Sequence, residues 1–196
     1  MTIPLVAHRG YAQNYPENTR LALAQALQRG AQYIEFDVQL TLDQVPIVLH
    51  DASLQRTAND WSDATPVMAL TWDQVKTVAV GEPARFGEQF SQVTISALLE
   101  VVELLRQHPH AQAFVEIKAE SVNAFSVDEV VSAVLAVLQP VLAQCVIIAF
   151  QAEVVTAVQA VAACQTGWVL EQWSVAALTT ARHLAPDYLF VDYQQV

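Results

Sequence analysis

Short apolar runs recur along the chain, and amphipathic stretches separate them. The runs lie at residues 4–7, 33–40, 46–49, 113–117, 146–150, 166–170 and 188–191. Uninterrupted apolar runs of this length are typical of strands that are buried on both faces, as strands in parallel sheets are. Because helical patterns with short connections alternate with these runs, the chain is predicted to form βα units around one parallel sheet.

The expected helices have recognisable ends. Polar residues that can cap a helix N-terminus precede four helical patterns, at Asn18, Thr71, Ser126 and Ser174. The segments that begin at Thr71 and Ser126 also fit a capping box, because Gln or Glu follows three residues later. The helix after Ser126 is expected to stop before Pro140, and the last helix before Pro186.

One long segment departs from this alternation. Residues 51–112 combine a turn-rich stretch with two helical patterns, and we interpret them as an insertion after the third strand. A length of 196 residues suits one domain of barrel type, and no change of composition divides the chain. Residues 1–196 are therefore predicted to form a single domain.

Composition narrows the classes of function. Hydrophobic residues make up 54% of the chain and charged residues 15%, which is enough for a large core and unlike a disordered protein. The net charge of −11 argues against nucleic-acid binding and against docking on anionic membranes. The chain shows neither an apolar run that predicts a membrane span nor a basic, apolar leader, so the cytoplasm is the expected location. Cys145 and Cys164 are interpreted as small buried hydrophobic residues.

Acidic residues interrupt two of the apolar runs. Glu35 and Asp37 lie two positions apart, as do Glu116 and Lys118, so each pair shares one side of its strand. Buried carboxylates are costly unless a cation compensates them, and one lysine does not balance three of them. The sequence therefore predicts a bound cation, and oxygen ligands suit Mg²⁺ or Ca²⁺. Zinc is disfavoured because the chain lacks a Cys/His cluster.

Two histidines close strand patterns. His8, followed by Arg9, ends the first run, and His50 ends the third. The C-terminal ends of strands form the catalytic face of barrels and of open α/β sheets, so these histidines indicate a catalytic site beside the carboxylates. The alternatives are a structural role for the histidines and a plain salt-bridge role for the carboxylates, paired with Arg9 and Lys118.

The order of these motifs resembles the glycerophosphodiester phosphodiesterase family. The resemblance is dense over residues 5–57 and thin elsewhere, and it depends on the ordered set rather than on any one piece. The motifs are His8-Arg9-Gly10, Pro16-Glu17-Asn18-Thr19, Glu35-x-Asp37-Val38-x-x-Thr41-x-Asp43, Pro46-x-Val48-x-His50-Asp51, Leu54-x-Arg56-Thr57 and Glu116-Ile117-Lys118.

The resemblance implies a TIM (β/α) barrel that hydrolyses a small glycerophosphodiester to glycerol 3-phosphate and an alcohol, with a divalent metal. The metal ligands that it implies are Glu35, Asp37 and Glu116. The implied acid–base residues are His8 and His50, and the implied phosphate contacts are Arg9 and Lys118. Analogy with related barrel phosphodiesterases favours His8 as base and His50 as acid. Water and a neighbouring hydroxyl of the substrate both stay open as the nucleophile.

The chain departs from the family pattern in two places. Gln44 stands where the family usually has Gly, and we expect this change to be minor. Only seven strand patterns are visible, so the barrel is expected to lack its eighth βα unit. If 196 residues are the whole protein, such a barrel would have an open edge beside the first strand, and we expect either a homodimer that covers the gap or a less stable, less active protein. If the chain is instead a fragment, the longer chain is expected to be more stable and more active.

Two other functions fit parts of the pattern. A lysophospholipase D-like phosphodiesterase would share the site but would need an apolar channel or a membrane-facing loop, which the acidic composition disfavours. A non-catalytic phosphate-binding remnant would explain the missing unit, but it would leave the complete set of His, Glu, Asp and Lys residues unexplained.

Overall fold

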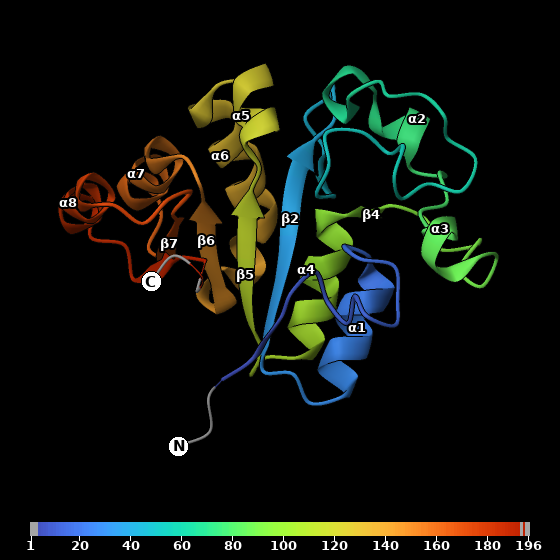
Figure 1. The fold of residues 1–196 in the computed structure, drawn as a ribbon, viewed down its shortest axis with the longest axis horizontal. Helices are drawn as coiled ribbons and strands as arrows, with labels where there is room; N and C mark the ends of the chain where they lie inside the picture. Colours follow the sequence, from blue (N-terminus) through green and yellow to red (C-terminus); the bar gives the residue numbers. More distant parts are fainter. Residues whose placement is uncertain (1–3, 193, 195–196) are drawn as a thin grey trace.

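The computed structural model describes residues 4–192 and 194, which form one sheet with helices packed along it (Figure 1). The strands are β1 (Val6–Ala7), β2 (Tyr33–Leu40), β3 (Pro46–Val48), β4 (Ser96–Ala97), β5 (Gln112–Ile117), β6 (Cys145–Ala149), β7 (Gln165–Val169) and β8 (Tyr188–Phe190). The α-helices are α1 (Arg20–Gln28), α2 (Trp72–Val75), α3 (Pro83–Phe86), α4 (Leu98–Gln107), α5 (Ala119–Ala124), α6 (Val127–Leu138), α7 (Ala152–Val161) and α8 (Val175–Leu184). Two 3-10 turns, η1 (Val67–Ala69) and η2 (Gln139–Gln144), complete the elements.

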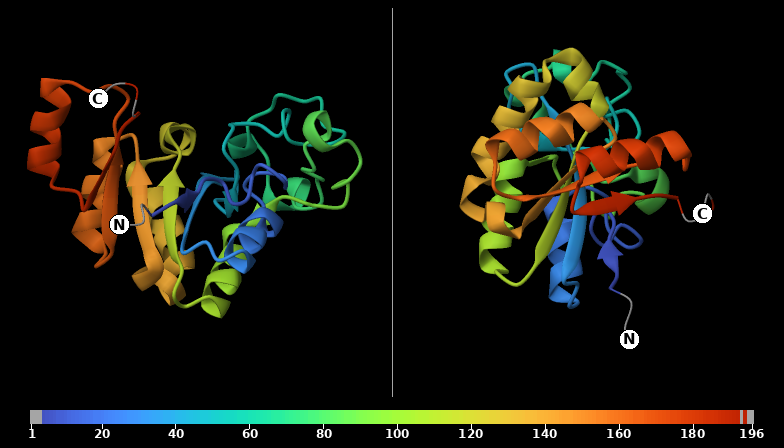
Figure 2. Two further views of the ribbon diagram at one scale, coloured as in Figure 1. Left: turned by 60° about the horizontal axis from the view of Figure 1, so that its bottom comes forward. Right: turned by 90° about the vertical axis from the view of Figure 1, so that its left-hand side faces the viewer.

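Parallel pairing runs through the sheet in the order β1, β2, β5, β6, β7, β8. Within the described part of the chain β1 and β8 do not pair with each other, so the sheet stays open (Figure 2). The fold class, an α/β barrel with an incomplete sheet, is confirmed.

The position of β3 differs from the expected one. It is not a parallel barrel strand: it pairs antiparallel with the end of β2, and β4 pairs antiparallel with β3. The five residues between β2 and β3 are enough for a hairpin, whereas a parallel crossover needs a dozen or more. Six strands are therefore parallel in the described chain, two fewer than in a closed TIM barrel, so the gap is wider than the single missing unit expected from the sequence.

The edge of β2 opposite β5 is divided between two strands. β1 pairs with its first residues, Tyr33 and Ile34, and β3 pairs with its last, from Val38 to Leu40. An aromatic layer on the inward face of the sheet contains Tyr33 of β2, Phe114 of β5 and Tyr188 of β8, and the rings of Phe114 and Tyr188 meet edge to face at 5.2 Å. Glu35 and Glu116 each follow this layer two positions later along their strand, so the acidic residues lie above an apolar floor.

The main core lies between the other face of the sheet and the helices α1, α4, α6 and α7. A separate cluster packs Ile47 of β3 against Leu54 and Val75 of the insertion, which lies beside the C-terminal end of β2 (Figure 1). Val127–Gln144 is long and apolar enough to span a membrane by length and composition alone. Its residues Val134 and Leu138 are buried in the main core, so it gives no clear membrane span.

Three of the four predicted caps are confirmed, at Thr71, Ser126 and Ser174. The prediction for Asn18 is wrong. Thr19 caps α1 and accepts a hydrogen bond from Ala22, because the Asn18 backbone is left-handed and its side chain binds elsewhere.

The two cysteines are both free. Cys145 is buried as expected, and burial raises the pKa of its thiol to about 12. Cys164 is only partly buried, although the sequence placed it in the core.

Candidate active site

Three carboxylates meet on the inward face of β2 and β5. Glu35 and Asp37 lie two positions apart on β2, and the parallel register places Asp37 opposite Glu116 of β5. Each side chain offers one oxygen, and these oxygens all lie within 4.8 Å of one another. Glu35 is 6% exposed and Asp37 1%, so the sheet buries them almost completely. The structure thus brings together the three residues that the sequence predicted as metal ligands.

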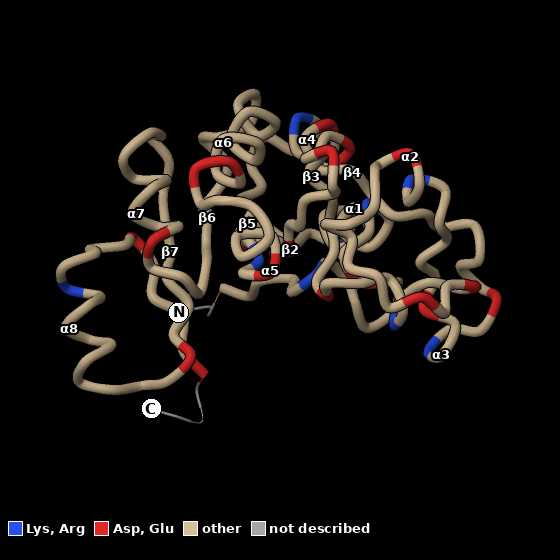
Figure 3. The backbone as a smooth tube through the Cα atoms, turned by 90° about the horizontal axis from the view of Figure 1, so that it is seen from above, with Lys and Arg blue, Asp and Glu red and all other residues tan. Residues whose placement is uncertain are grey.

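Two cations approach this acidic cluster. The Lys118 ammonium donates to Glu116 at 2.7 Å and lies 3.5 Å from Asp37. The Arg9 guanidinium lies 3.4 Å from Asp37, and the Arg9 backbone N–H donates to Glu35 at 2.9 Å. Acidic and basic residues therefore adjoin at the ends of β2 and β5, while acidic residues predominate over the whole chain (Figure 3). The salt-bridge alternative describes part of the geometry, but two cations face three carboxylates.

Glu35 has the least compensated charge of the three. Its Oε1 atom is buried and has no hydrogen-bond partner. Burial, with the neighbouring Asp37 carboxylate, raises the pKa of Glu35 to about 8. Burial also raises the pKa of Glu116, although the hydrogen bond from Lys118 opposes this. The cluster therefore has an acceptor position that no described residue of the chain satisfies.

Asn18 completes the environment of Asp37. Its amide nitrogen donates to the Asp37 carboxylate at 2.7 Å, and its amide oxygen accepts from the Asp37 backbone N–H at 3.0 Å. Asn18 makes this double contact from a left-handed backbone, with φ near 53°.

The two histidines border the cluster from different strands. His8 follows β1, and its Nε2 lies 3.7 Å from the Glu35 carboxylate. The ring is largely exposed, yet partial burial and the adjacent Arg9 guanidinium lower the pKa of His8. His50 follows β3, and its Nδ1 lies 2.7 Å from the Asp51 carboxylate. His50 makes a smaller contribution to the lowered pKa of His8, so the two rings lie within electrostatic range of each other.

An outer ring of charged residues surrounds this site. Arg56 donates to Asp51 at 2.6 and 3.0 Å and to Glu17 at 2.7 Å, and Glu17 also accepts from Arg9 at 2.9 Å. Glu17, Asp51 and Arg56 had no predicted role and were known only as members of the motifs. The motifs that contain Glu17 and Arg56 could have marked these two residues as part of the site. Neither motif alone indicates that the two side chains contact each other.

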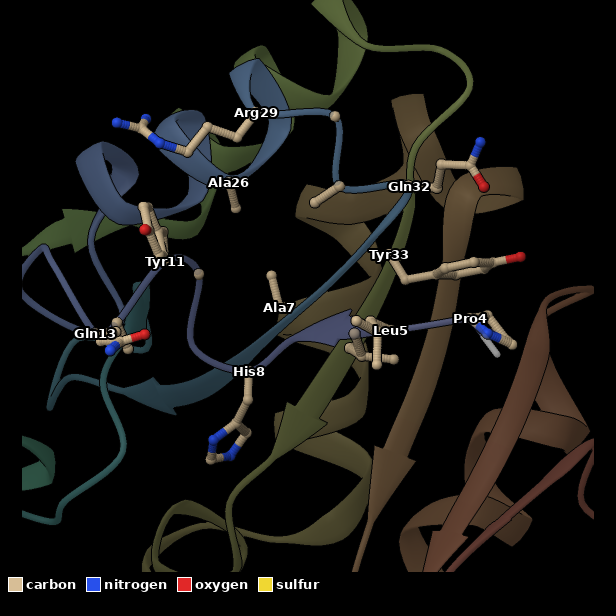
Figure 4. Close-up of a pocket in the computed structure, with 15 residues that line it drawn as sticks. Pro4, Leu5, Ala7, His8, Tyr11, Gln13, Ala26, Arg29, Gln32 and Tyr33 are labelled. Carbon is tan, nitrogen blue, oxygen red and sulfur yellow. The ribbon is translucent and has the colours of Figure 1, made fainter. Parts of the chain in front are cut away.

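A cavity lies beside the acidic cluster rather than over it. It has a volume of about 610 Å³ and opens along β1 and α1, with Tyr11, Arg29 and Tyr33 in its wall (Figure 4). His8 borders both the cavity and the cluster. The cavity runs along the edge of β1 that pairs with no strand in the described part of the chain. It is accessible because the sheet is not closed there. A smaller cavity of about 400 Å³, lined by Phe150 and Trp168, lies near the ends of β6 and β7.

Comparison with known proteins identifies the family. Residues 8–196 match the model of the Glycerophosphoryl diester phosphodiesterase family. The chain belongs to this family. It is 41% identical over 101 residues to a glycerophosphodiester phosphodiesterase of Caldanaerobacter subterraneus subsp. tengcongensis, a match that covers 52% of this chain and 40% of that protein. It is 41% identical over 115 residues to the enzyme of the same name from Bacillus altitudinis, covering 58% of this chain and 44% of that protein.

Solved structures of the family share the fold. A phosphodiesterase from Oleispira antarctica, in complex with the product sn-glycerol-3-phosphate, superposes with a TM-score of 0.85 at 25% identity. That superposition covers 97% of this chain and 75% of the other. This family member thus spans less than half of the two relatives above and about three quarters of the solved structure.

Proposed function

We propose that the chain hydrolyses glycerophosphodiesters to glycerol 3-phosphate and an alcohol, with a divalent metal. The observation that carries this proposal is the buried cluster of three carboxylates with one unsatisfied oxygen, bordered by two histidines and two cations. Membership of the family supports it, as does the glycerol phosphate product bound to the related Oleispira antarctica enzyme.

The residues present fit a metal. Glu35, Asp37 and Glu116 would hold it, and the orphaned Oε1 of Glu35 is the kind of acceptor that a cation satisfies. Carboxylate oxygens suit Mg²⁺ and Ca²⁺ alike, so both stay candidates. A metal bound there would polarise a phosphoryl oxygen of the substrate.

Arg9 and Lys118 are proposed to bind the phosphate. An ammonium has three N–H donors, and contacts to Glu116 and Asp37 leave a third for a phosphoryl oxygen. Charge-assisted hydrogen bonds of this kind position the diester and offset its negative charge, which otherwise repels a nucleophile.

We propose that His8 is the base and His50 the acid. The lowered pKa of His8 favours the neutral ring that accepts a proton from the attacking oxygen, whether from water or from a hydroxyl of the substrate. Nδ1 of His50 lies 2.7 Å from the Asp51 carboxylate, and the protonated ring is proposed to donate a proton to the leaving alkoxide.

The test is hydrolysis of glycerophosphocholine by the purified chain. Activity should vanish in EDTA and return with Mg²⁺ or Ca²⁺, and His8→Ala and His50→Ala should each lower kcat by about 10²-fold or more. Exposed His110 offers a matched control, His110→Ala, that should keep native turnover. Full activity in EDTA would refute the metal role, and faster turnover of a lysolipid would favour the lysophospholipase D-like alternative. A folded, inactive chain would favour the non-catalytic remnant.

A further inference from the structure

The His50 ring is held by the carboxylate of its own neighbour in the sequence. The backbone bends at both residues, and this allows Nδ1 of His50 to lie 2.7 Å from the Asp51 carboxylate. The backbone carbonyl of His50 accepts a hydrogen bond from the Gln39 side chain at 3.3 Å. Gln39 is fully buried on β2 and accepts in turn from Ser121 at 2.6 Å. The backbone of His50 is therefore tied to β2, and the ring is tied to Asp51.

Asp51 is itself clamped. The Arg56 guanidinium donates to both of its carboxylate oxygens, at 2.6 and 3.0 Å. The same guanidinium donates to Glu17, which also accepts from Arg9. Planar two-point contacts of this kind fix a carboxylate in orientation as well as in place. A continuous chain of ion pairs thus runs from His50 to the phosphate-facing Arg9.

This arrangement decides which ring nitrogen of His50 is available. Burial alone would raise the pKa of Asp51, but hydrogen bonds from Arg56 and His50 hold it at about 2, so the carboxylate is ionised at neutral pH. An ionised carboxylate can only accept hydrogen bonds, and Nδ1 of His50 must therefore donate. The neutral ring then carries its free lone pair on Nε2, and the protonated ring carries its second N–H there.

We infer that Asp51 is a positioning residue that presents Nε2 of His50 to the substrate, and that Arg56 and Glu17 hold Asp51 in that position. The inference rests on the proposed acid–base function of His50. A plain structural anchor for the insertion would need the Asp51–Arg56 pair, but it would not need the contact from Asp51 to the His50 ring. His8 has a different environment, because its nearest carboxylate is Glu35, a member of the acidic cluster.

The test combines an activity readout with one that does not depend on activity. In the ¹⁵N spectrum of the labelled full chain, the native His50 ring should show the Nδ1–H tautomer, with His50→Ala used to assign its signals. Asp51→Asn should lose that tautomer and lower kcat by about 10²- to 10⁴-fold with KM retained, as an Asp-to-Asn exchange does in a Ser-His-Asp triad. The matched control is Asp63→Asn, an exposed aspartate of the same insertion whose carboxylate accepts hydrogen bonds from Thr65.

Arg56 tests the second part of the inference. If it acts through Asp51, the double variant Asp51→Asn/Arg56→Ala should be no slower than Asp51→Asn alone. Additive losses in kcat would overturn the role given to Arg56. Thermal melting checks that each variant is folded, and Asp51→Glu, which keeps the carboxylate, should recover part of kcat if Asp51→Asn melts early.

The two proposals can fail separately. A His50 ring that keeps the Nδ1–H tautomer in folded Asp51→Asn overturns the inference, and so does native turnover in that variant. If the native chain hydrolyses nothing, the proposed function fails, while the tautomer measurement still decides whether Asp51 orients the ring.

Discussion

Replacing Glu35 by Gln should make the metal-free protein more stable at pH 8, although it removes a proposed metal ligand. Glu35 is almost fully buried, and its Oε1 atom has no partner. Its pKa rises from an ordinary value of 4.5 to about 8. Each tenfold change in proton affinity is worth about 1.4 kcal/mol, so holding Glu35 ionised in the folded chain costs about 5 kcal/mol.

The pH dependence of this cost follows from the direction of the change. The folded protein binds the Glu35 proton more tightly than the unfolded chain, so stability falls as pH rises above 4.5 and levels off above about 8. About 3 to 4 kcal/mol of the loss lies between pH 5 and pH 8. Gln resembles the protonated carboxyl in size and hydrogen bonding, so Glu35→Gln should lose this dependence.

Urea unfolding in EDTA at pH 5 and pH 8 measures both quantities. The native chain should lose more stability between the two pH values than Glu35→Gln, and Mg²⁺ or Ca²⁺ at pH 8 should recover it in the native chain only. Glu103→Gln, on the exposed side of α4, is the matched control and should follow the native curve. Equal pH dependence in the native chain and Glu35→Gln would refute the reasoning that the cluster holds an uncompensated charge.

Two further predictions concern the fold. Gln44 has a left-handed backbone with φ near 58°, which costs a residue other than Gly about 1 kcal/mol or more. Gln44→Gly should therefore stabilise the chain in urea unfolding. The gain should be only about 0.5–1 kcal/mol, because Gly also has more conformational freedom in the unfolded chain, and this offsets part of the relieved strain. An unchanged midpoint would contradict this. The open edges of β1 and β8 expose Leu5, Val6 and Leu189, so size-exclusion chromatography with light scattering should detect a dimer at high concentration, and a monomer throughout would show that these edges need no cover.

Local rules predicted the parts of the structure that depend on neighbours in the sequence. The period of two along a strand placed Glu35 and Asp37 on one face, and the structure shows them there. The apolar run at 46–49 did not reveal that β3 is antiparallel, because burial produces the same pattern in either direction. The length of the connection would have shown it, since five residues cannot form a parallel crossover.

Contacts between distant segments limited the prediction of the site. Asn18 fits the rule for a helix cap, but its side chain binds Asp37 instead. Thr19 is therefore the residue that caps α1. Glu17 and Arg56 are 39 positions apart and meet where the insertion contacts the loop between β1 and α1. A single sequence contains the residues of such a pair without indicating that they are partners.

Because β1 pairs with only part of β2, the His8 side of the site is held by fewer backbone contacts than the carboxylate cluster. The carboxylates lie where β2 and β5 pair over six residues, whereas His8 follows β1, which is held to β2 by two residue pairs. Local opening is easier where fewer backbone contacts must break, so the strand before His8 can open while the acidic cluster stays assembled. Under the proposed function, a preparation fully loaded with metal would then still turn over poorly. The metal content would overstate the active fraction, and titration of the active sites would measure that fraction directly.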